Sequence, residues 1–192
     1  MEKFQKSALI TLFILTTSIL RLIPHLPNFT PIGALGLFGG AYFGKKRSIL
    51  TVIAAMLLSD YLLLYVNPYS PRPVDFSHLY APTALVHSTS LFVYAGLLIN
   101  VIIGWKVARN KSVANIITAS LLASVQFFLI TNFGVWVSGY YPQNIHGLLQ
   151  SYIAGLPFFR WTLIGDLFYT TMLFGSYELV FKHSTAKLRL KA

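Results

Sequence analysis

The sequence contains no cysteine, so disulfide bonds and thiolate metal ligands are excluded. Acidic residues are scarce as well, because only 5 Asp and Glu stand against 15 Lys and Arg in 192 residues. HExxH, a GxSxG elbow and a phosphate-cradling glycine loop are all missing. We therefore find no nucleophile–base pair to assign, and we predict a protein that is not an enzyme and carries no resident metal or cofactor.

Hydrophobic residues, in contrast, make up 55 % of the chain, and the mean hydropathy is +0.64. Charged residues account for 10 %, where soluble proteins have about 25 %. The first apolar run contains Arg21 and no small-residue cleavage site, so we expect it to be retained rather than cleaved as a signal peptide. The composition predicts one all-α membrane domain, residues 1–192, with six transmembrane helices. The six apolar runs are Ser7–Ile23, Phe29–Gly44, Ser48–Val66, Ser88–Ala108, Val113–Val137 and Trp161–Phe181.

The basic residues lie at the ends of the apolar runs and not on a face interleaved with exposed aromatic residues. This placement argues against nucleic acid as a partner and is typical of a chain embedded in a lipid bilayer. Twelve Lys and Arg residues fall on one side of the six-span arrangement, and only Arg72 and Arg160 on the other. The positive-inside rule then predicts that both termini are cytoplasmic, in an inner (cytoplasmic) membrane. The twelve are Lys3, Lys6, Lys45, Lys46, Arg47, Lys106, Arg109, Lys111, Lys182, Lys187, Arg189 and Lys191.

The predicted outer loops are rich in Pro, Tyr, His and Asn. They cover Pro24–Asn28, Asn67–His87 and Ser138–Arg160, whereas the predicted cytoplasmic connections are only a few residues long. Loops longer than a compact bundle needs are usually functional. We expect these loops to serve binding, with a location on the lipid interface as the alternative.

Several polar residues interrupt the apolar runs, and a count along each helix places them in the outer half of the bilayer. Ionisable groups in membrane spans are costly and mark functional sites. We predict an outward-facing polar pocket that is defined by Arg21, Asp60, Gln126, Asn132 and Asp166. An alternative is that Arg21 pairs with Asp60 or Asp166 and only locks the helices together.

The stretch RLIPHLPNFTPIGALGLFGGAYFG, residues 21–44, joins the first two runs. Its prolines predict a helix, a turn and a second helix. The turn carries His25, Asn28 and Thr30, which we add to the predicted pocket. The glycines that follow have GxxxG spacing, which predicts close helix packing. Trp136 is a further candidate for stacking on a flat ligand, although an interfacial aromatic belt explains it equally well.

Five blocks of the chain are familiar as a set: RLIPHLPNFTPIGALGLFGGAYF, LLSDYLL, HSTSLFVY, FFLITNFGVWVSGYYP and GLPFFRWTLIGDLFYTTMLFG. They resemble a bacterial family of small six-helix proteins that includes the vitamin B12 transporter-like BtuM proteins. That family is similar to the substrate-binding S components of energy-coupling-factor (ECF) vitamin transporters. The resemblance covers nearly the whole chain.

The resemblance implies an S-component-like bundle that takes up a vitamin-like molecule, such as cobalamin or another corrinoid, with an ECF coupling module as a partner. Cobalamin-binding members are associated with a cysteine ligand to cobalt, which this chain lacks. We therefore expect His87 to be the axial ligand if a corrinoid binds. A membrane enzyme acting on a lipid or isoprenoid head group, and a non-transporting assembly subunit, remain the alternatives. The complete predicted binding set is Arg21, His25, Asn28, Thr30, Asp60, His87, Asn132, Trp136 and Asp166.

Overall fold

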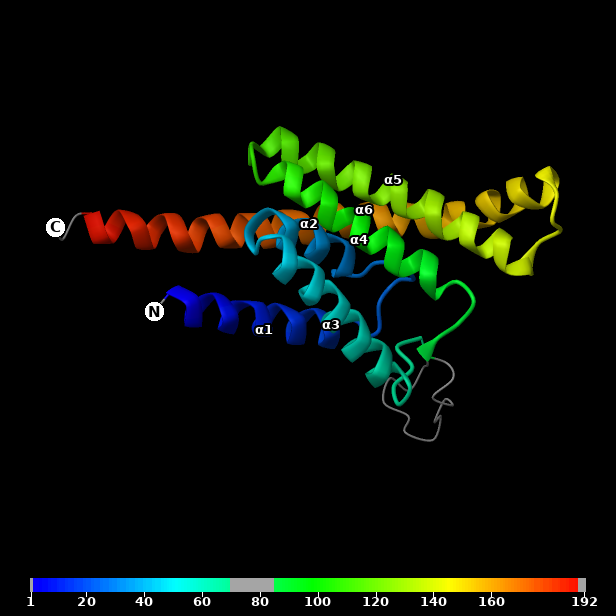
Figure 1. The fold of residues 1–192 in the computed structure, drawn as a ribbon, viewed down its shortest axis with the longest axis horizontal. Coiled ribbons are helices and arrows are strands. Elements are labelled where there is room, and N and C mark those ends of the chain that lie inside the picture. Colours follow the sequence, from blue (N-terminus) through cyan, green and yellow to red (C-terminus); the bar gives the residue numbers. More distant parts are fainter. Residues whose placement is uncertain (1, 70–84, 190–192) are drawn as a thin grey trace.

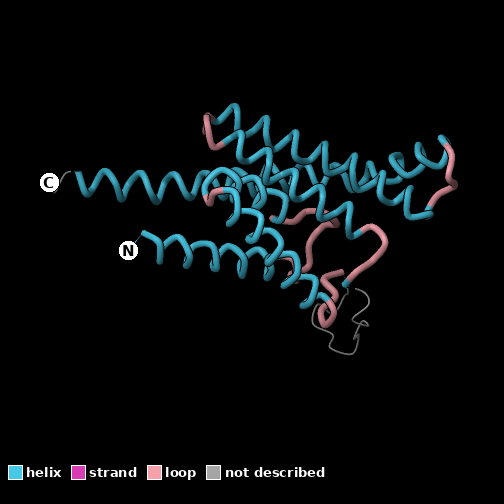
Figure 2. The backbone as a smooth tube through the Cα atoms, in the orientation of Figure 1, coloured by secondary structure: helices cyan, strands magenta, loops and turns pink. Residues whose placement is uncertain are grey.

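The computed structural model describes residues 2–69 and 85–189, and this part of the chain folds into six α-helices without a β-strand (Figures 1 and 2). The all-α prediction is thereby confirmed for these residues. The helices are α1 (Glu2–Leu20), α2 (Ile32–Tyr42), α3 (Lys45–Leu63), α4 (Ser90–Val107), α5 (Val113–Val135) and α6 (Ile145–Arg189), and a π-helical turn, η2 (Trp136–Tyr140), extends α5.

The connections between helices fall at two ends of the bundle. Both termini lie at the same end as the α2–α3 and α4–α5 connections (Figure 1). We call this the basic end, because Lys45, Lys46, Arg47, Lys106, Arg109 and Lys111 lie there. The α1–α2, α3–α4 and α5–α6 connections lie toward the opposite end, which we call the loop end. Most of the predicted Asn67–His87 loop, including Arg72, lies outside the described residues.

Helix α2 is the centre of the bundle, and every residue from Ile32 to Ala41 is buried. Helix α2 has only 11 residues and none of them is charged. Neighbouring helices cover its backbone on all sides. A Cβ atom on Gly40 would clash with the Val101 carbonyl oxygen of α4, and one on Gly104 would clash with that of Leu37. The close helix packing predicted from the GxxxG spacing is found here, between α2 and α4.

Gly44 has a different role from the one its spacing suggested. Its φ angle is 80°, a left-handed conformation, and a Cβ atom there would meet no other atom within 4 Å. It precedes the first residue of α3. Gly44 therefore allows a tight connection between α2 and α3, where glycine is favoured because it lacks Cβ. It does not contribute to helix packing.

The start of α6 differs most from the sequence prediction. The apolar run was expected to begin at Trp161 after a loop over Ser138–Arg160, but the helix begins at Ile145. That loop prediction was wrong for residues 145–160. The helix is capped by Asn144, whose Oδ1 accepts a hydrogen bond from the Gly147 amide at 2.9 Å. Pro157 lies within the helix, although proline lacks the amide donor of a helical hydrogen bond.

Within the described ranges, two helices are long and apolar enough to cross a membrane, judged by length and composition. They are Ser90–Val107, with a mean hydropathy of 1.7, and Val113–Tyr140, with 1.9. The segments Ser7–Leu22 and Ile32–Tyr42 are shorter apolar helices. The fold is thus helical with two candidate membrane spans.

Candidate ligand-binding cavity

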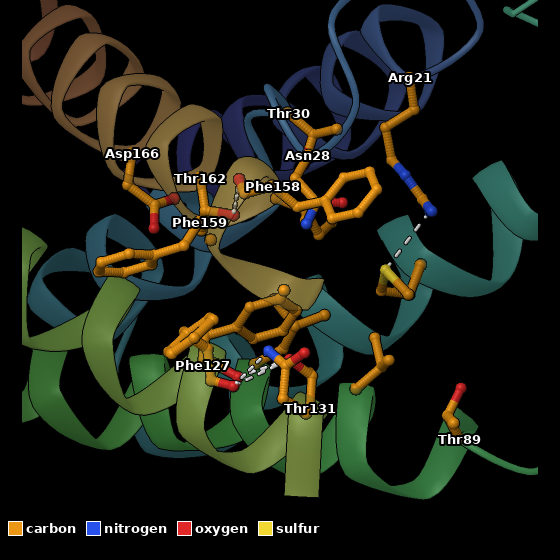
Figure 3. A pocket seen from close by; sticks show the side chains of 18 of the residues that line it. Arg21, Asn28, Thr30, Thr89, Phe127, Thr131, Phe158, Phe159, Thr162 and Asp166 are labelled. Atoms are coloured by element: carbon orange, nitrogen blue, oxygen red, sulfur yellow. Dashed lines mark hydrogen bonds between the residues drawn. The ribbon is translucent and has the colours of Figure 1, made fainter. Parts of the chain in front are cut away.

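A cavity of about 360 Å³ lies at the loop end, between α3, α4, α5, α6 and the α1–α2 connection (Figure 3). Its volume falls in the range of about 300–1,000 Å³ that is usual for small-molecule sites. Six of the nine predicted binding residues line it, namely Arg21, His25, Asn28, Thr30, Asn132 and Asp166.

Arg21 lies directly after the end of α1 and is held against α3. Its Nη1 donates to Asp60 Oδ1 at 2.8 Å and also contacts the Ser59 hydroxyl. The Tyr94 hydroxyl of α4 donates to the second Asp60 oxygen at 3.3 Å. Of the two partners considered for Arg21, the structure selects Asp60. Arg21 lines the cavity, whereas Asp60 does not.

The α1–α2 connection brings three polar residues to the cavity. Asn28 has a φ angle of 66°, a left-handed conformation that asparagine tolerates better than most residues. The turn is closed by a hydrogen bond from the Thr30 amide to the Asn28 carbonyl at 3.0 Å. His25 Nδ1 lies 2.6 Å from the Ile23 carbonyl oxygen, and its ring centroid is 5.6 Å from that of Tyr69.

Asp166 of α6 is the buried carboxylate of the cavity and is only 5 % exposed. Its Oδ2 accepts a hydrogen bond from the Ser124 hydroxyl of α5 at 2.7 Å. Among the residues that the structure describes, no Lys, Arg or His side chain forms an ion pair with it. The other oxygen, Oδ1, lies against the backbone of Gly33 in α2, where a Cβ atom would clash with it.

Asn132 of α5 is placed in a similar way. Its Nδ2 donates to the Phe128 carbonyl at 2.8 Å, and its Oδ1 lies where a Cβ atom on Gly155 would be. Asn100 of α4 also lines the cavity, although sequence analysis did not select it. Its Oδ1 accepts from Gln126 Nε2 at 2.5 Å. A polar residue inside the apolar run Ser90–Val107 was the signal that could have identified it.

Aromatic rings form much of the cavity wall, and sequence analysis missed them as well. The Phe128 and Phe159 rings of α5 and α6 have centroids 4.7 Å apart. The sequence pairs Phe127-Phe128 and Phe158-Phe159 supply four of the rings, and Phe127, Phe158 and Phe159 are labelled in Figure 3. The aromatic lining residues are Tyr69, Phe127, Phe128, Phe158 and Phe159.

Two other predicted binding residues, His87 and Trp136, do not line the cavity. The His87 Nδ1 atom bonds to the Thr89 hydroxyl at 2.8 Å, next to the start of α4. The Trp136 Nε1 donates to the Pro142 carbonyl at 3.0 Å and so fixes the turn between α5 and α6. Within residues 2–69 and 85–189, no group of three His, Asp or Glu side chains is arranged to hold a metal ion.

A helical protein with candidate membrane spans and a ligand-sized cavity at one end is the class that these observations define. The chain belongs to a family of unknown function (DUF6580), whose model matches residues 1–188. No curated protein and no solved structure matches the chain.

Proposed function

We propose that this protein is a multi-pass bacterial inner-membrane protein that binds a small, vitamin-like molecule from outside the cell and takes part in its uptake. The observation that carries the proposal is the cavity itself. It brings together polar residues from the α1–α2 connection, α4, α5 and α6, and it lies at the loop end. An assembly subunit would have no need to leave this space unfilled by side chains.

The distribution of side chains supports a lipid environment. Helix α5 carries an exposed apolar stripe at a spacing of four residues, formed by Ile117, Leu121, Val125, Leu129 and Phe133. The buried face of the same helix holds Ala119, Ser120, Ala123, Ser124 and Gly134. Apolar residues outside and small or hydroxyl residues inside are typical of helices packed in a bilayer.

The two ends of the bundle support the orientation. The described basic residues Lys45–Arg47 and Lys106–Lys111 lie at the same end as both termini. The positive-inside rule places that end in the cytoplasm and the cavity on the outer side. This arrangement suits capture of a molecule that arrives from outside.

The geometry of Asp166 favours binding over catalysis. The Ser124 hydroxyl lies 2.7 Å from the Asp166 carboxylate, which is the separation of a nucleophile and a base. However, Ser124 is completely buried and does not line the cavity. A ligand in the cavity therefore has no access to that hydroxyl.

The cavity favours a ligand smaller than a corrinoid. A volume of about 360 Å³ is near the lower limit for small-molecule sites, and a corrin ring with its amide side chains exceeds it. The proposed histidine ligand to cobalt, His87, lies outside the lining. An ECF coupling module remains a proposed partner. The glycines of α2 are buried, so they do not form a surface to which such a module could bind.

Native mass spectrometry of the protein purified in detergent tests this proposal. We expect the wild-type protein to carry a small molecule that is released by collisional activation. Thr131→Trp places a large ring in the cavity and should abolish the adduct, whereas Val125→Trp, on the exposed face of the same helix, should retain it. An adduct of equal abundance in both variants contradicts binding in this cavity.

A further inference from the structure

The charges and the free carboxylate oxygen of the cavity point to the chemistry of its ligand. We infer that the cavity selects a small aromatic molecule with a protonated amine, and that the amine binds to the Asp166 carboxylate. This inference rests on the proposed function, because it names the class of molecule that the same cavity binds.

The first argument is the balance of charge. In the part of the chain described, the cavity lining contains one guanidinium group, that of Arg21, and one carboxyl group, that of Asp166. The charge of Arg21 is compensated by Asp60, with an N–O distance of 2.8 Å. Asp166 has only a neutral hydroxyl donor, from Ser124. A buried charge without a partner is costly, so a cationic ligand gains the attraction that the protein leaves unused.

The second argument is a free acceptor atom. Asp166 Oδ1 accepts no hydrogen bond from any described residue. Asp166 lines the cavity and is only 5 % exposed, so a donor for this oxygen has to come from a molecule in the cavity. An ammonium group supplies up to three N–H donors.

The third argument is the aromatic wall. Tyr69, Phe127, Phe128 and Phe159 supply flat apolar surface beside the polar groups. Aromatic rings pair in offset or tilted arrangements and also attract cations to their faces. In Figure 3, Phe159 lies beside Asp166, while Arg21 is on the other side of the view. A ring with an amine on a short arm fits both surfaces within about 360 Å³.

Thermal unfolding of the detergent-purified protein with matched compounds tests the inference. The probes are tryptamine, phenethylamine and 4-(aminomethyl)pyridine, each compared with the alcohol and the carboxylate that replace its amine. We expect at least one amine to raise the melting temperature and its alcohol and carboxylate to have no effect.

Variants then assign the effect to Asp166. Asp166→Asn keeps an oxygen for the Ser124 hydroxyl but removes the charge, and it should weaken amine binding at least tenfold. Glu178→Gln removes a carboxylate from the same helix outside the cavity and should leave the affinity unchanged. If Asp166→Asn does not fold, Phe159→Leu replaces it, because the Phe159 ring lies beside Asp166 in the cavity wall (Figure 3), and it should weaken the binding of the same amine.

Three results overturn the inference: no response to any amine, equal responses to amine and alcohol, or unchanged amine affinity in both variants. The outcome is separable from that of the proposed function. A neutral or anionic molecule in the native mass spectrum, lost in Thr131→Trp, refutes the amine and leaves uptake intact. An adduct that survives Thr131→Trp refutes the cavity as the binding site.

Discussion

The two ends of the bundle use the same helices in opposite ways. At the loop end, α2 and α6 border a cavity with polar groups. Toward the basic end, Phe38 of α2 is completely buried and is surrounded by aromatic rings that include two from α6. The ring centroids of five neighbours lie 4.8 to 5.6 Å from that of Phe38, and these are Phe13, Tyr42, Phe43, Phe174 and Tyr177. The candidate site therefore lies at the loop end, whereas packed aromatic rings fill the space between the helices toward the basic end.

Glycines also act differently at the two ends. Gly40 and Gly104 let the backbones of α2 and α4 touch, which brings the helices together. Gly33 and Gly155 instead leave room for the side chains of Asp166 and Asn132. Close approach of backbones makes the basic end dense, whereas close approach of a polar side chain to a backbone shapes the loop end.

Removing the Phe38 ring should have the largest effect on stability. Phe38→Ala deletes a fully buried ring, and such changes cost about 3–5 kcal/mol of stability. We expect a strong fall in the detergent melting temperature. Phe168→Ala, at a ring of α6 that is 49 % exposed, is the matched control and should have a small effect. Similar losses from the two substitutions would show that the cluster around Phe38 does not dominate stability.

Separating α2 from α4 should have the next largest effect. Gly40→Ala forces a methyl group against the backbone of α4, and overpacking of this kind costs about 1–3 kcal/mol. Gly175→Ala is the control, because no atom lies within 4 Å of its added Cβ. In that unobstructed helical position alanine is favoured over glycine by about 1 kcal/mol. We expect opposite shifts in melting temperature, and shifts of the same sign would contradict the α2–α4 contact.

The ion pair at the loop end is partly exposed and should contribute less. Arg21 and Asp60 side chains are 16 % and 21 % exposed. Arg21→Met leaves Asp60 without its cation and should cost about 1–2 kcal/mol. The double variant with Asp60→Asn should recover part of that loss, which a double-mutant cycle measures. Lys46→Met, an exposed position, is the control, and equal effects of Arg21→Met and Lys46→Met would rule out a stabilising pair.

Single cysteines should disturb stability least and still distinguish the two ends. The chain has no cysteine, so each substitution introduces a unique thiol. Lys46→Cys and Lys111→Cys at the basic end should be shielded from an impermeant reagent in intact cells. Ser88→Cys and Gln143→Cys at the loop end should be labelled. Labelling of Lys46→Cys in sealed cells would reverse the proposed orientation.

Helix positions could be predicted from the sequence where apolar runs end in charged or turn residues. The runs Ser88–Ala108 and Val113–Val137 differ from α4 and α5 by at most two residues at each end. The start of α6 could not be predicted, because a proline inside a helix and a proline in a loop give the same local signal. Only packing against α5 decides between them.

The candidate site was predictable in part. Polar residues in apolar runs identified Arg21, Asn132 and Asp166, since few other roles explain their cost in such a position. His25 and His87 could not be told apart, because both follow or precede an apolar run in a loop. The turn through Asn28 brings the first to the cavity, while the bond to Thr89 keeps the second outside it. The Phe-Phe pairs were hidden among other apolar residues.

The length of α6 has a mechanical consequence. One uninterrupted helix joins Asp166, at the cavity, to Arg189 beyond the basic end. The 23 intervening steps correspond to about 35 Å at a rise of about 1.5 Å per residue. A tilt of about 5° pivoting at the cavity moves the far tip by ~3 Å. A rigid α6 would thus act as a lever arm, in which a small adjustment at the cavity displaces the end of the helix beyond the basic end.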